Sequence, residues 1–543
     1  MILRFYRFVF LFFCIASFPS IAQEIDTTTA PQDWFLRDPE QDHVQGVSVE
    51  RTYSTLLKDQ PSREVLVAVI DSGVDIDHED LKDVIWTNKN EIPDNGIDDD
   101  KNGYIDDIHG WNFIGGENGN VDADTYELTR EYVRLKKKFE NLEDGKINRK
   151  LRAEYQQYKD IKEKFEKERD SNTEEYNMYR KIYVNAIMSI DTLKAVMHTD
   201  TLTQAKLQQF SSNDPTLLFA KSFVLNLYQN IGPDLTKLIA ELEEGVKHYQ
   251  TAVEIGYNED FDSRIIVGDD YANTNEKYYG NNNVKGPDSG HGTHVSGIIA
   301  ADRKNNLGIK GIADNVKIMS VRAVPDGDER DKDVANAIMY AVDNGAKIIN
   351  MSFGKAYSPQ KEAVDRAVKH AEQKGVLLIH AAGNEGEDID KENNFPTRFY
   401  KDGSEAKNWL EIGASSAGDT EEFVASFSNY GKKSVDLFAP GVQIYSTQPE
   451  SKYTAEDGTS FASPATAGVA ALLMSYFPEF TANEIKDILK KSSRKFDNLQ
   501  VQRPGGKGSV KFSELSNTGG LVNAYEAVKL AQGLKGQAKR TND

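Results

Sequence analysis

The chain has 543 residues and a formal net charge of −21, with 86 acidic side chains against 65 lysines and arginines. This balance argues against nucleic acid and anionic lipid as partners, because both need clustered basic side chains. The length allows a large hydrophobic core and predicts two or three structural units rather than one.

Residues 1–22 predict a cleaved secretory signal peptide. Two arginines precede an apolar run over 8–18, and small residues around Ala22 supply a cleavage site. An uncleaved N-terminal anchor is the alternative. The run is short for a bilayer span, and no other segment reaches the roughly 20 apolar residues that a span requires. We therefore expect a secreted or periplasmic protein with no membrane span after cleavage. Its one cysteine, Cys14, would be removed with the signal.

Strand and helix patterns alternate after a connecting segment, 23–63. The helical stripes have apolar residues three and four positions apart. The strand runs are continuous and β-branched, as in strands buried on both faces. These runs are 65–70, 316–321, 347–351, 376–379 and 409–412. Such alternation predicts an α/β fold with a mainly parallel sheet covered by helices on both faces.

One segment, 126–260, breaks this alternation. It is rich in lysine, glutamate, glutamine and tyrosine, and its apolar positions recur at helical spacing. Asp214-Pro215 has the composition of a helix start. We predict an inserted helical subdomain of several antiparallel helices, and a partly disordered charged insert is the alternative.

Three motifs carry side chains suited to nucleophilic catalysis. Asp71 ends the first strand run, His291 lies in the sequence GHGTHVSG at a helix start, and Ser460 opens an alanine-rich helix. Unpaired N–H groups at a helix start favour the negative charge that develops when a serine attacks. Alternatives exist for each motif, because Asp71 or Ser460 could be a capping residue. His291 and His294 could also bind a metal, although no glutamate lies between them as in zinc proteases.

The order of the motifs separates two classes of hydrolase. The sequence GTSFA around Ser460 is close to the nucleophile elbow of α/β-hydrolases, which raises an esterase or lipase as a rival function. In that fold the order is serine, acid, histidine, whereas here it is aspartate, histidine, serine. The order of the motifs therefore argues against an esterase or lipase of the α/β-hydrolase fold.

In these contexts and this order, the chain resembles the subtilase family of serine peptidases. A fourth motif, HAAGNEG with Asn384, agrees with the family as well. The resemblance covers roughly 65–115 and 268–491. It implies a three-layer α/β/α subtilisin-like fold with a central parallel seven-stranded sheet, and a serine endopeptidase using Asp71, His291 and Ser460.

The resemblance also implies roles for residues around the triad. Asn384 would donate a side-chain hydrogen bond to the oxyanion, although GNEG alone could be a turn. Ser352, Phe353 and Gly354 would pair with an extended peptide as an added strand. Phe353 and Phe395 would line the first specificity pocket, which predicts broad specificity with an apolar side chain before the scissile bond. Either ring could instead belong to the core.

An acidic loop predicts a structural calcium site. Counted from Asp98, oxygen-bearing side chains stand at the first, third, fifth and ninth positions with glycine at the sixth, as in an EF-hand-type loop. The candidate ligands are Asp98, Asp100, Asn102 and Asp106. His109 replaces the glutamate of the twelfth position, so the pattern is incomplete, and a solvated acidic turn is the alternative. The resemblance adds a second candidate calcium site at Asp80 and Asn305.

The sequence thus predicts six segments. They are a signal peptide (1–22), a connecting segment (23–63), a first peptidase part (64–125), the inserted helical subdomain (126–260), a second peptidase part (261–530) and a C-terminal tail (531–543). The connecting segment is too short for the prodomain usual in subtilases, so we hypothesise that the subdomain assists folding or covers the cleft. Polypeptides are the expected substrates. A peptide-binding pseudopeptidase, or a scaffold binding a protein partner through the subdomain, is the alternative.

Overall fold

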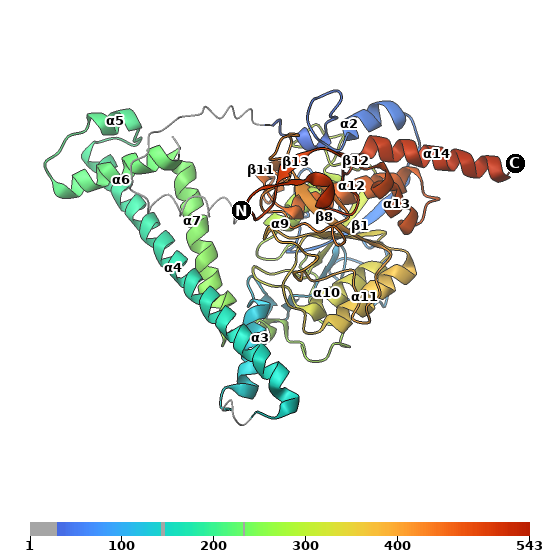
Figure 1. Cartoon of the computed structure of the whole chain (residues 1–543), viewed down its shortest axis with the longest axis horizontal. Helices are drawn as coiled ribbons and strands as arrows, with labels where there is room; N and C mark the ends of the chain where they lie inside the picture. The colour runs from blue at the N-terminus through green and yellow to red at the C-terminus, as the bar shows by residue number, and fades with distance from the viewer. Residues whose placement is uncertain (1–29, 143–146, 232–233, 543) are drawn as a thin grey trace. The chain divides into compact units, whose positions relative to one another are not determined.

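The computed structural model describes residues 30–142, 147–231 and 234–542 (Figure 1). The expected signal peptide lies outside these residues. The chain divides into two compact units: the core unit, up to Asp122 and again from Ser263, and the helical unit, Ala123–Asp262. In the part of the chain that is described, no helix is long and apolar enough to cross a bilayer.

A nine-stranded sheet forms the centre of the core unit, as far as the described residues show. Its neighbouring strands pair in parallel except at the β12–β15 edge. In spatial order the strands are β12 (Arg494–Lys495), β15 (Gly520–Leu521), β9 (Leu437–Pro440), β8 (Trp409–Ser415), β7 (Leu377–Ala381), β6 (Ile348–Met351), β1 (Val65–Asp71), β5 (Val316–Arg322) and β2 (Gly110–Asn112). The sheet has two more strands than the seven that the resemblance implied. The two-residue strands β12 and β15 lie beyond residue 491, where the resemblance ends.

The sheet is buried on both faces, which confirms the interpretation of the apolar runs as central strands. In β1, Val67 and Val69 pack into one hydrophobic cluster, while Ala68 and Ile70 pack into another. Successive side chains of a strand point to opposite faces, so a strand between two helical layers has to be apolar throughout.

Helices cover both faces and give three layers, α/β/α, as expected (Figure 1). One cluster joins the face of Val67 and Val69 to α9, α12, α13 and α14, and the other joins the opposite face to α10 and α11. The helices are α9 (Gly290–Ala300), α10 (Asp331–Asp343), α11 (Lys361–Lys374), α12 (Thr459–Tyr476), α13 (Ala482–Ser492) and α14 (Ala524–Asn542).

Smaller elements surround these layers. They are helices α2 (Val49–Arg51) and α8 (Arg264–Val267), and the antiparallel pairs β3–β4 (Gly115–Gly116, Gly119–Asn120), β10–β11 (Ile444–Gln448, Lys452–Glu456) and β13–β14 (Gln500–Gln502, Ser509–Lys511).

The described part of the predicted connecting segment, residues 30–63, is here called the N-terminal segment, and it packs into the core of the core unit. Trp34 is fully buried, and its indole N–H donates to the carbonyl of Gln443 at 3.2 Å. The Val47 N–H donates to the Phe35 carbonyl at 2.8 Å, and the Val47 carbonyl accepts the N–H of Ala524 at 2.8 Å, at the start of α14. The segment therefore joins the helical layer built from the C-terminal part of the chain.

The helical unit contains five α-helices in the residues described. They are α3 (Glu127–Phe139), α4 (Arg152–Val196), α5 (Gln204–Gln209), α6 (Pro215–Ile231) and α7 (Leu235–Thr251). The apolar positions that recur at helical spacing in the sequence make contacts between these helices. Tyr132 of α3, for example, stacks on Phe165 of α4 with ring centroids 4.3 Å apart. At the start of α6, Asp214 accepts the backbone N–H of Thr216 at 2.7 Å, as its position before Pro215 predicts.

Candidate active site

Asp71 and His291 form a hydrogen-bonded pair at the end of β1. The Nδ1 atom of His291 lies 2.7 Å from Oδ1 of Asp71. Asp71 is 1% exposed, whereas the side chain of His291 is 38% exposed. The imidazole therefore lies between the buried carboxylate and the solvent. Oδ2 of Asp71 is buried and has no hydrogen-bond partner among the described residues. His291 and the backbone N–H of Ser72, 2.7 and 2.8 Å from Oδ1, therefore compensate this buried carboxylate.

The electrostatics of His291 suit a base. Burial disfavours its charged form, but the Coulombic attraction and hydrogen bond of Asp71 outweigh burial and raise the pKa of His291 above its ordinary value. Because Nδ1 faces the carboxylate, Nε2 is the atom left to exchange a proton with a hydroxyl.

Glycine at position 292 lets α9 reach the end of β1. A Cβ atom on Gly292 would lie 2.2 Å from the carbonyl oxygen of Gly73, too close for any other side chain without movement of the backbone. The close approach brings His291, on the first turn of α9, to Asp71.

The neighbouring His294 has a different role. It is fully buried, its Nε2 bonds to the Thr454 carbonyl at 3.3 Å, and burial lowers its pKa to about 3. The two histidines are thus engaged separately, His291 with Asp71 and His294 with the β10–β11 hairpin. This arrangement favours the base over the metal-ligand alternative.

Ser460 is the second residue of α12, close to the histidines. The ring of Phe461 lies 5.6 Å from that of His291 and 4.4 Å from that of His294, which fixes the helix start beside the Asp71–His291 pair. The hydroxyl of Ser460 donates to the Ser352 carbonyl at 3.1 Å. A hydrogen bond to His291 therefore requires rotation of the hydroxyl away from Ser352.

Asn384 is bonded in a way that fixes the direction of its amide. Its Oδ1 accepts the backbone N–H and the hydroxyl of Thr459, each at 2.9 Å. Thr459 Oγ1 in turn accepts the N–H of Gly383 at 3.1 Å. With the oxygen engaged, the NH₂ group is the donor that Asn384 can offer to a ligand. The orienting role of Thr459 had no signal in the sequence.

The candidate substrate segment lies directly beside Ser460. The hydroxyl of Ser352 donates to the Ser460 carbonyl at 2.8 Å. Lys355 and Phe395 exchange backbone hydrogen bonds of 2.9 and 2.8 Å, so the chain after Gly354 runs antiparallel to the segment that carries Phe395. Phe353 is half-buried and packs against the α10–α11 side of the sheet, and Phe395 is half-buried.

Three carboxylates converge in the acidic loop. Oxygens of Glu91, Asp100 and Asp107 lie within 4.8 Å of one another. Burial raises the pKa of Asp107 to about 6, although hydrogen bonds from Tyr340, Asn102 and Asn88 oppose the rise. Of these three carboxylates the spacing pattern contained only Asp100. Asp107 stands within the pattern at its tenth position, which is not a ligand position, and Glu91 precedes the pattern.

The other candidate ligands of this loop bond to backbone. Asp98 and Asp106 each accept two backbone N–H groups of the loop, at 2.9–3.0 Å and 2.9–3.3 Å. The amide of Asn102 donates to Asp107 at 3.0 Å, and His109 bonds through Nδ1 to the carbonyl of Trp86. The loop thus has an inner group of carboxylates and an outer group that shapes its turns.

Asp80 and Asn305 also meet. The amide of Asn305 donates to Asp80 at 2.7 Å, and the N–H of Ile309 donates to the other carboxylate oxygen at 3.1 Å. Burial raises the pKa of Asp80. Both carboxylate oxygens are therefore already engaged by protein donors.

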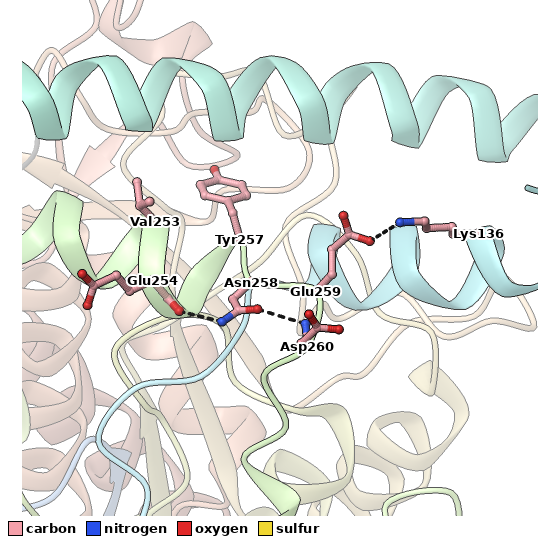
Figure 2. A pocket seen from close by; sticks show the side chains of 7 residues that line it. All are labelled: Lys136, Val253, Glu254, Tyr257, Asn258, Glu259 and Asp260. Carbon is pink, nitrogen blue, oxygen red and sulfur yellow. Dashed lines mark hydrogen bonds and ion pairs between the residues drawn. The ribbon is translucent and has the colours of Figure 1, made fainter.

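The helical unit has a hollow of about 550 Å³ of its own (Figure 2). Figure 2 shows Glu259 turned toward Lys136, with the carboxylate and ammonium 2.6 Å apart, and Asn258 bonded to its neighbours. The lining residues are Lys136, Val253, Glu254, Tyr257, Asn258, Glu259 and Asp260. They include neither a serine nor a histidine, so this hollow lacks the groups of the core-unit site.

The core unit combines a three-layer subtilisin-like fold with an aspartate–histidine pair beside a helix start that carries a serine. A family model described as the subtilase family matches residues 62–508, most of the chain. The chain belongs to the subtilase family.

Three relatives show how far the similarity extends. The thermophilic serine proteinase of Bacillus sp. (strain AK1) is 38% identical over 251 residues, covering 46% of this chain and 56% of that protein. The thermostable alkaline protease of Halalkalibacterium halodurans is 34% identical over 233 residues, covering 43% and 58%. Thermitase of Thermoactinomyces vulgaris is 35% identical over 242 residues, covering 44% and 75%. The chain thus spans little more than half the length of the first two relatives.

Proposed function

We propose that this chain is an exported serine endopeptidase that cleaves polypeptides through an acyl-enzyme intermediate. The observation that carries the proposal is the 2.7 Å contact between Asp71 and His291, with the Ser460 helix start packed against the same imidazole through Phe461. Asp71, His291 and Ser460 form the triad of this proposal, and Asn384 the oxyanion site.

In the first half-reaction Ser460 attacks the scissile carbonyl while Nε2 of His291 takes the hydroxyl proton. Asp71 keeps the imidazole in the correct tautomer and stabilises the imidazolium. The oxyanion is bound by the amide of Asn384 and the N–H of Ser460, which as the second residue of α12 has no partner one helical turn earlier. His291 then passes the proton to the leaving amine.

Hydrolysis of the acyl-enzyme repeats these steps with water as the nucleophile. His291 takes a proton from the water, and Ser460 regains its proton as the acid product leaves. No additional group is required.

Substrate binding can also start the reaction. The Ser352 carbonyl, which accepts the Ser460 hydroxyl at 3.1 Å, belongs to the segment proposed to pair with an extended peptide. A substrate N–H that bonds to this carbonyl competes with the hydroxyl and favours its rotation toward His291. Half-buried Phe353 and Phe395 support a preference for an apolar side chain before the scissile bond.

Calcium belongs to the same proposal as a structural ion. The donor set Glu91, Asp100 and Asp107 consists of the carboxylate oxygens that calcium prefers, and the three mutually repel unless a cation compensates them. These residues would hold the ion, which would stabilise the acidic loop. The pair Asp80–Asn305 is a weaker candidate, because it offers one carboxylate where the acidic loop offers three.

Export rests on the signal pattern of residues 1–22. The mature protein is then expected to begin near residue 23, which the mass of protein recovered outside the cytoplasm would test. Binding of a protein partner to the helical unit stays a prediction from the sequence.

The test of the peptidase is replacement of its nucleophile. Ser460→Ala is expected to lower kcat for a peptide amide by about a million-fold, the size known for such triads. Ser475→Ala is the matched control, because Ser475 lies at the other end of α12 and donates to the Arg63 carbonyl. Unchanged cleavage by Ser460→Ala would refute the proposal. Binding without cleavage by the unmodified protein would favour the pseudopeptidase.

A further inference from the structure

A buried histidine–glutamate pair lies beneath the candidate substrate segment. Nδ1 of His380 is 2.8 Å from Glu411, and Nε2 of His380 is 2.7 Å from the Phe353 carbonyl oxygen. His380 is fully buried and Glu411 is 5% exposed. The two residues are register partners on neighbouring parallel strands β7 and β8, so the sheet itself holds their side chains together.

The donors and acceptors around His380 determine its orientation. A carbonyl oxygen only accepts, so the proton of that contact is on Nε2 of His380. The second oxygen of Glu411 accepts the indole N–H of Trp409 at 2.8 Å. A turn of the imidazole would break both of its contacts and leave buried polar groups unpaired, which is costly.

The pair acts on a segment whose other hydrogen bonds, among the described residues, lie at its ends. The hydroxyl of Ser352 bonds to the Ser460 carbonyl at one end, and Lys355 pairs with Phe395 at the other. Between them, the Phe353 carbonyl is fixed by His380. The position of this carbonyl sets the Phe353 ring and also the adjoining Ser352 carbonyl, which accepts the Ser460 hydroxyl.

The His380 ring of the pair packs against apolar and aromatic side chains, which argues against a purely stabilising role. The His380 ring lies 5.3 Å from Trp409 and 6.3 Å from Phe353, on the sheet face that otherwise buries Met351 and Leu378. A buried ionisable pair generally stabilises a fold no better than apolar residues of similar volume. Its distinguishing contribution is the directed hydrogen bond to Phe353.

We propose that His380, oriented by Glu411, is a positioning residue that holds Ser352–Gly354 in the conformation that selects the side chain before the scissile bond. This inference deepens the proposed peptidase function and rests on it.

The experiment compares three variants that alter the pair differently. His380→Leu/Glu411→Leu replaces it with an apolar pair and removes the bond to Phe353. His380→Asn keeps a donor for Glu411 but is too short to reach Phe353. Glu411→Gln preserves every contact, because its amide can donate to Nδ1 of His380 and accept from Trp409. The control is His370→Leu/Asp343→Leu, which removes a 2.7 Å histidine–carboxylate pair elsewhere in the core unit.

Two readouts are measured on folded protein with an unchanged thermal midpoint. The first is the ratio of kcat/KM for peptide amides with phenylalanine or alanine before the scissile bond. The second is the affinity of the uncleaved phenylalanine peptide for each variant in a Ser460→Ala background, measured by fluorescence anisotropy. We expect the leucine pair and His380→Asn to lower kcat/KM for the phenylalanine peptide roughly 10- to 100-fold and to weaken its binding. Glu411→Gln and the control should have the same kcat/KM ratio and the same peptide affinity as the unmodified protein.

Retention of both the kcat/KM ratio and the peptide affinity by either disrupting variant would overturn the inference. A loss in Glu411→Gln equal to that of the leucine pair would overturn it too. If the unmodified protein cleaves no peptide, the proposed function has failed, and the binding series in the Ser460→Ala background still decides the role of His380.

Discussion

At the scale of single residues, the site depends on the contrast between Asp71 and His291. The carboxylate is buried, while the imidazole that it supports is more than a third exposed. An ionised aspartate in this position favours the imidazolium and so raises the pKa of His291 against the opposing effect of burial. Below that pKa the imidazole is protonated, and in the proposed mechanism it cannot accept the proton of Ser460.

The pH dependence of cleavage follows from this contact. We expect kcat/KM to rise with pH through an inflection above 6.5, the ordinary pKa of histidine. Asp71→Asn removes the charge that raises the pKa of His291, so its residual activity should be lower by about 10⁴ in kcat and its inflection should move to lower pH. Stopped assays across a pH series measure both effects.

Asp75→Asn is the control for that experiment, because Asp75 is a nearby buried carboxylate bonded to Lys285 rather than to His291. The pH inflection of kcat/KM for Asp75→Asn should equal that of the unmodified protein. An inflection that does not move in Asp71→Asn would show that the titrating group is not His291.

At the scale of elements, we expect the stabilisation of the acidic loop by the proposed calcium ion to depend on pH. The folded-state pKa of Asp107 is about 6, above its ordinary 3.8, because its charge is buried. A carboxyl with a raised pKa binds its proton more tightly in the folded state. Without metal, stability therefore falls as pH rises from about 4 to 6. The proposed calcium ion would compensate the ionised carboxylate and remove this loss.

We expect calcium to raise the thermal midpoint more at pH 7 than at pH 5, compared with chelator. A concentration 100 times the dissociation constant stabilises by about 2.7 kcal/mol. In Asp107→Asn the effect should shrink and lose its pH dependence. Asp94→Asn, at an exposed position of the same loop with a positive φ that asparagine tolerates, should behave as the unmodified protein. An equal calcium shift in Asp107→Asn would contradict this donor set.

The N-terminal segment supplies a second prediction about an element. Trp34 is fully buried beside the start of the C-terminal helical layer. Trp34→Ala should lower the free energy of unfolding by about 3–5 kcal/mol through the cavity that it leaves. Glu40→Ala, at a largely exposed side chain of the same segment, should change it little. Denaturant unfolding of both variants gives the comparison, and equal stabilities would mean that the segment is not part of the folded core.

The sequence indicated some of these elements better than others. The apolar runs predicted the five central strands because doubly buried strands leave continuous apolar stretches, whereas the two-residue β12 and β15 leave none. Local motifs pointed to Asp71, His291 and Ser460 as candidate catalytic residues. Glu91 and Asp107 join Asp100 through the path of a loop, and His380 meets Glu411 through strand register. Contacts of this kind are set by tertiary structure and have no fixed spacing in the chain.

At the scale of the whole molecule, a long insertion between two candidate catalytic residues requires anchored flanks. Within the core unit, Asn112 and Asn281 exchange backbone hydrogen bonds of 2.9 and 3.1 Å across the point of insertion. Buried Arg322 donates to the Ser72 carbonyl at 2.7 Å, next to Asp71, and to the carbonyl of Val121. These contacts hold the end of β1 in place independently of the length of chain inserted.

The central claim is that three distant stretches of this unit act as one nucleophilic site. Reaction with a fluorophosphonate, followed by peptide mass spectrometry, tests it most directly. The account predicts one phosphonylated residue, Ser460, with labelling greatly slowed in His291→Ala and absent in Ser460→Ala. Absence of label on the folded protein, or label at another residue that persists in both variants, would contradict it.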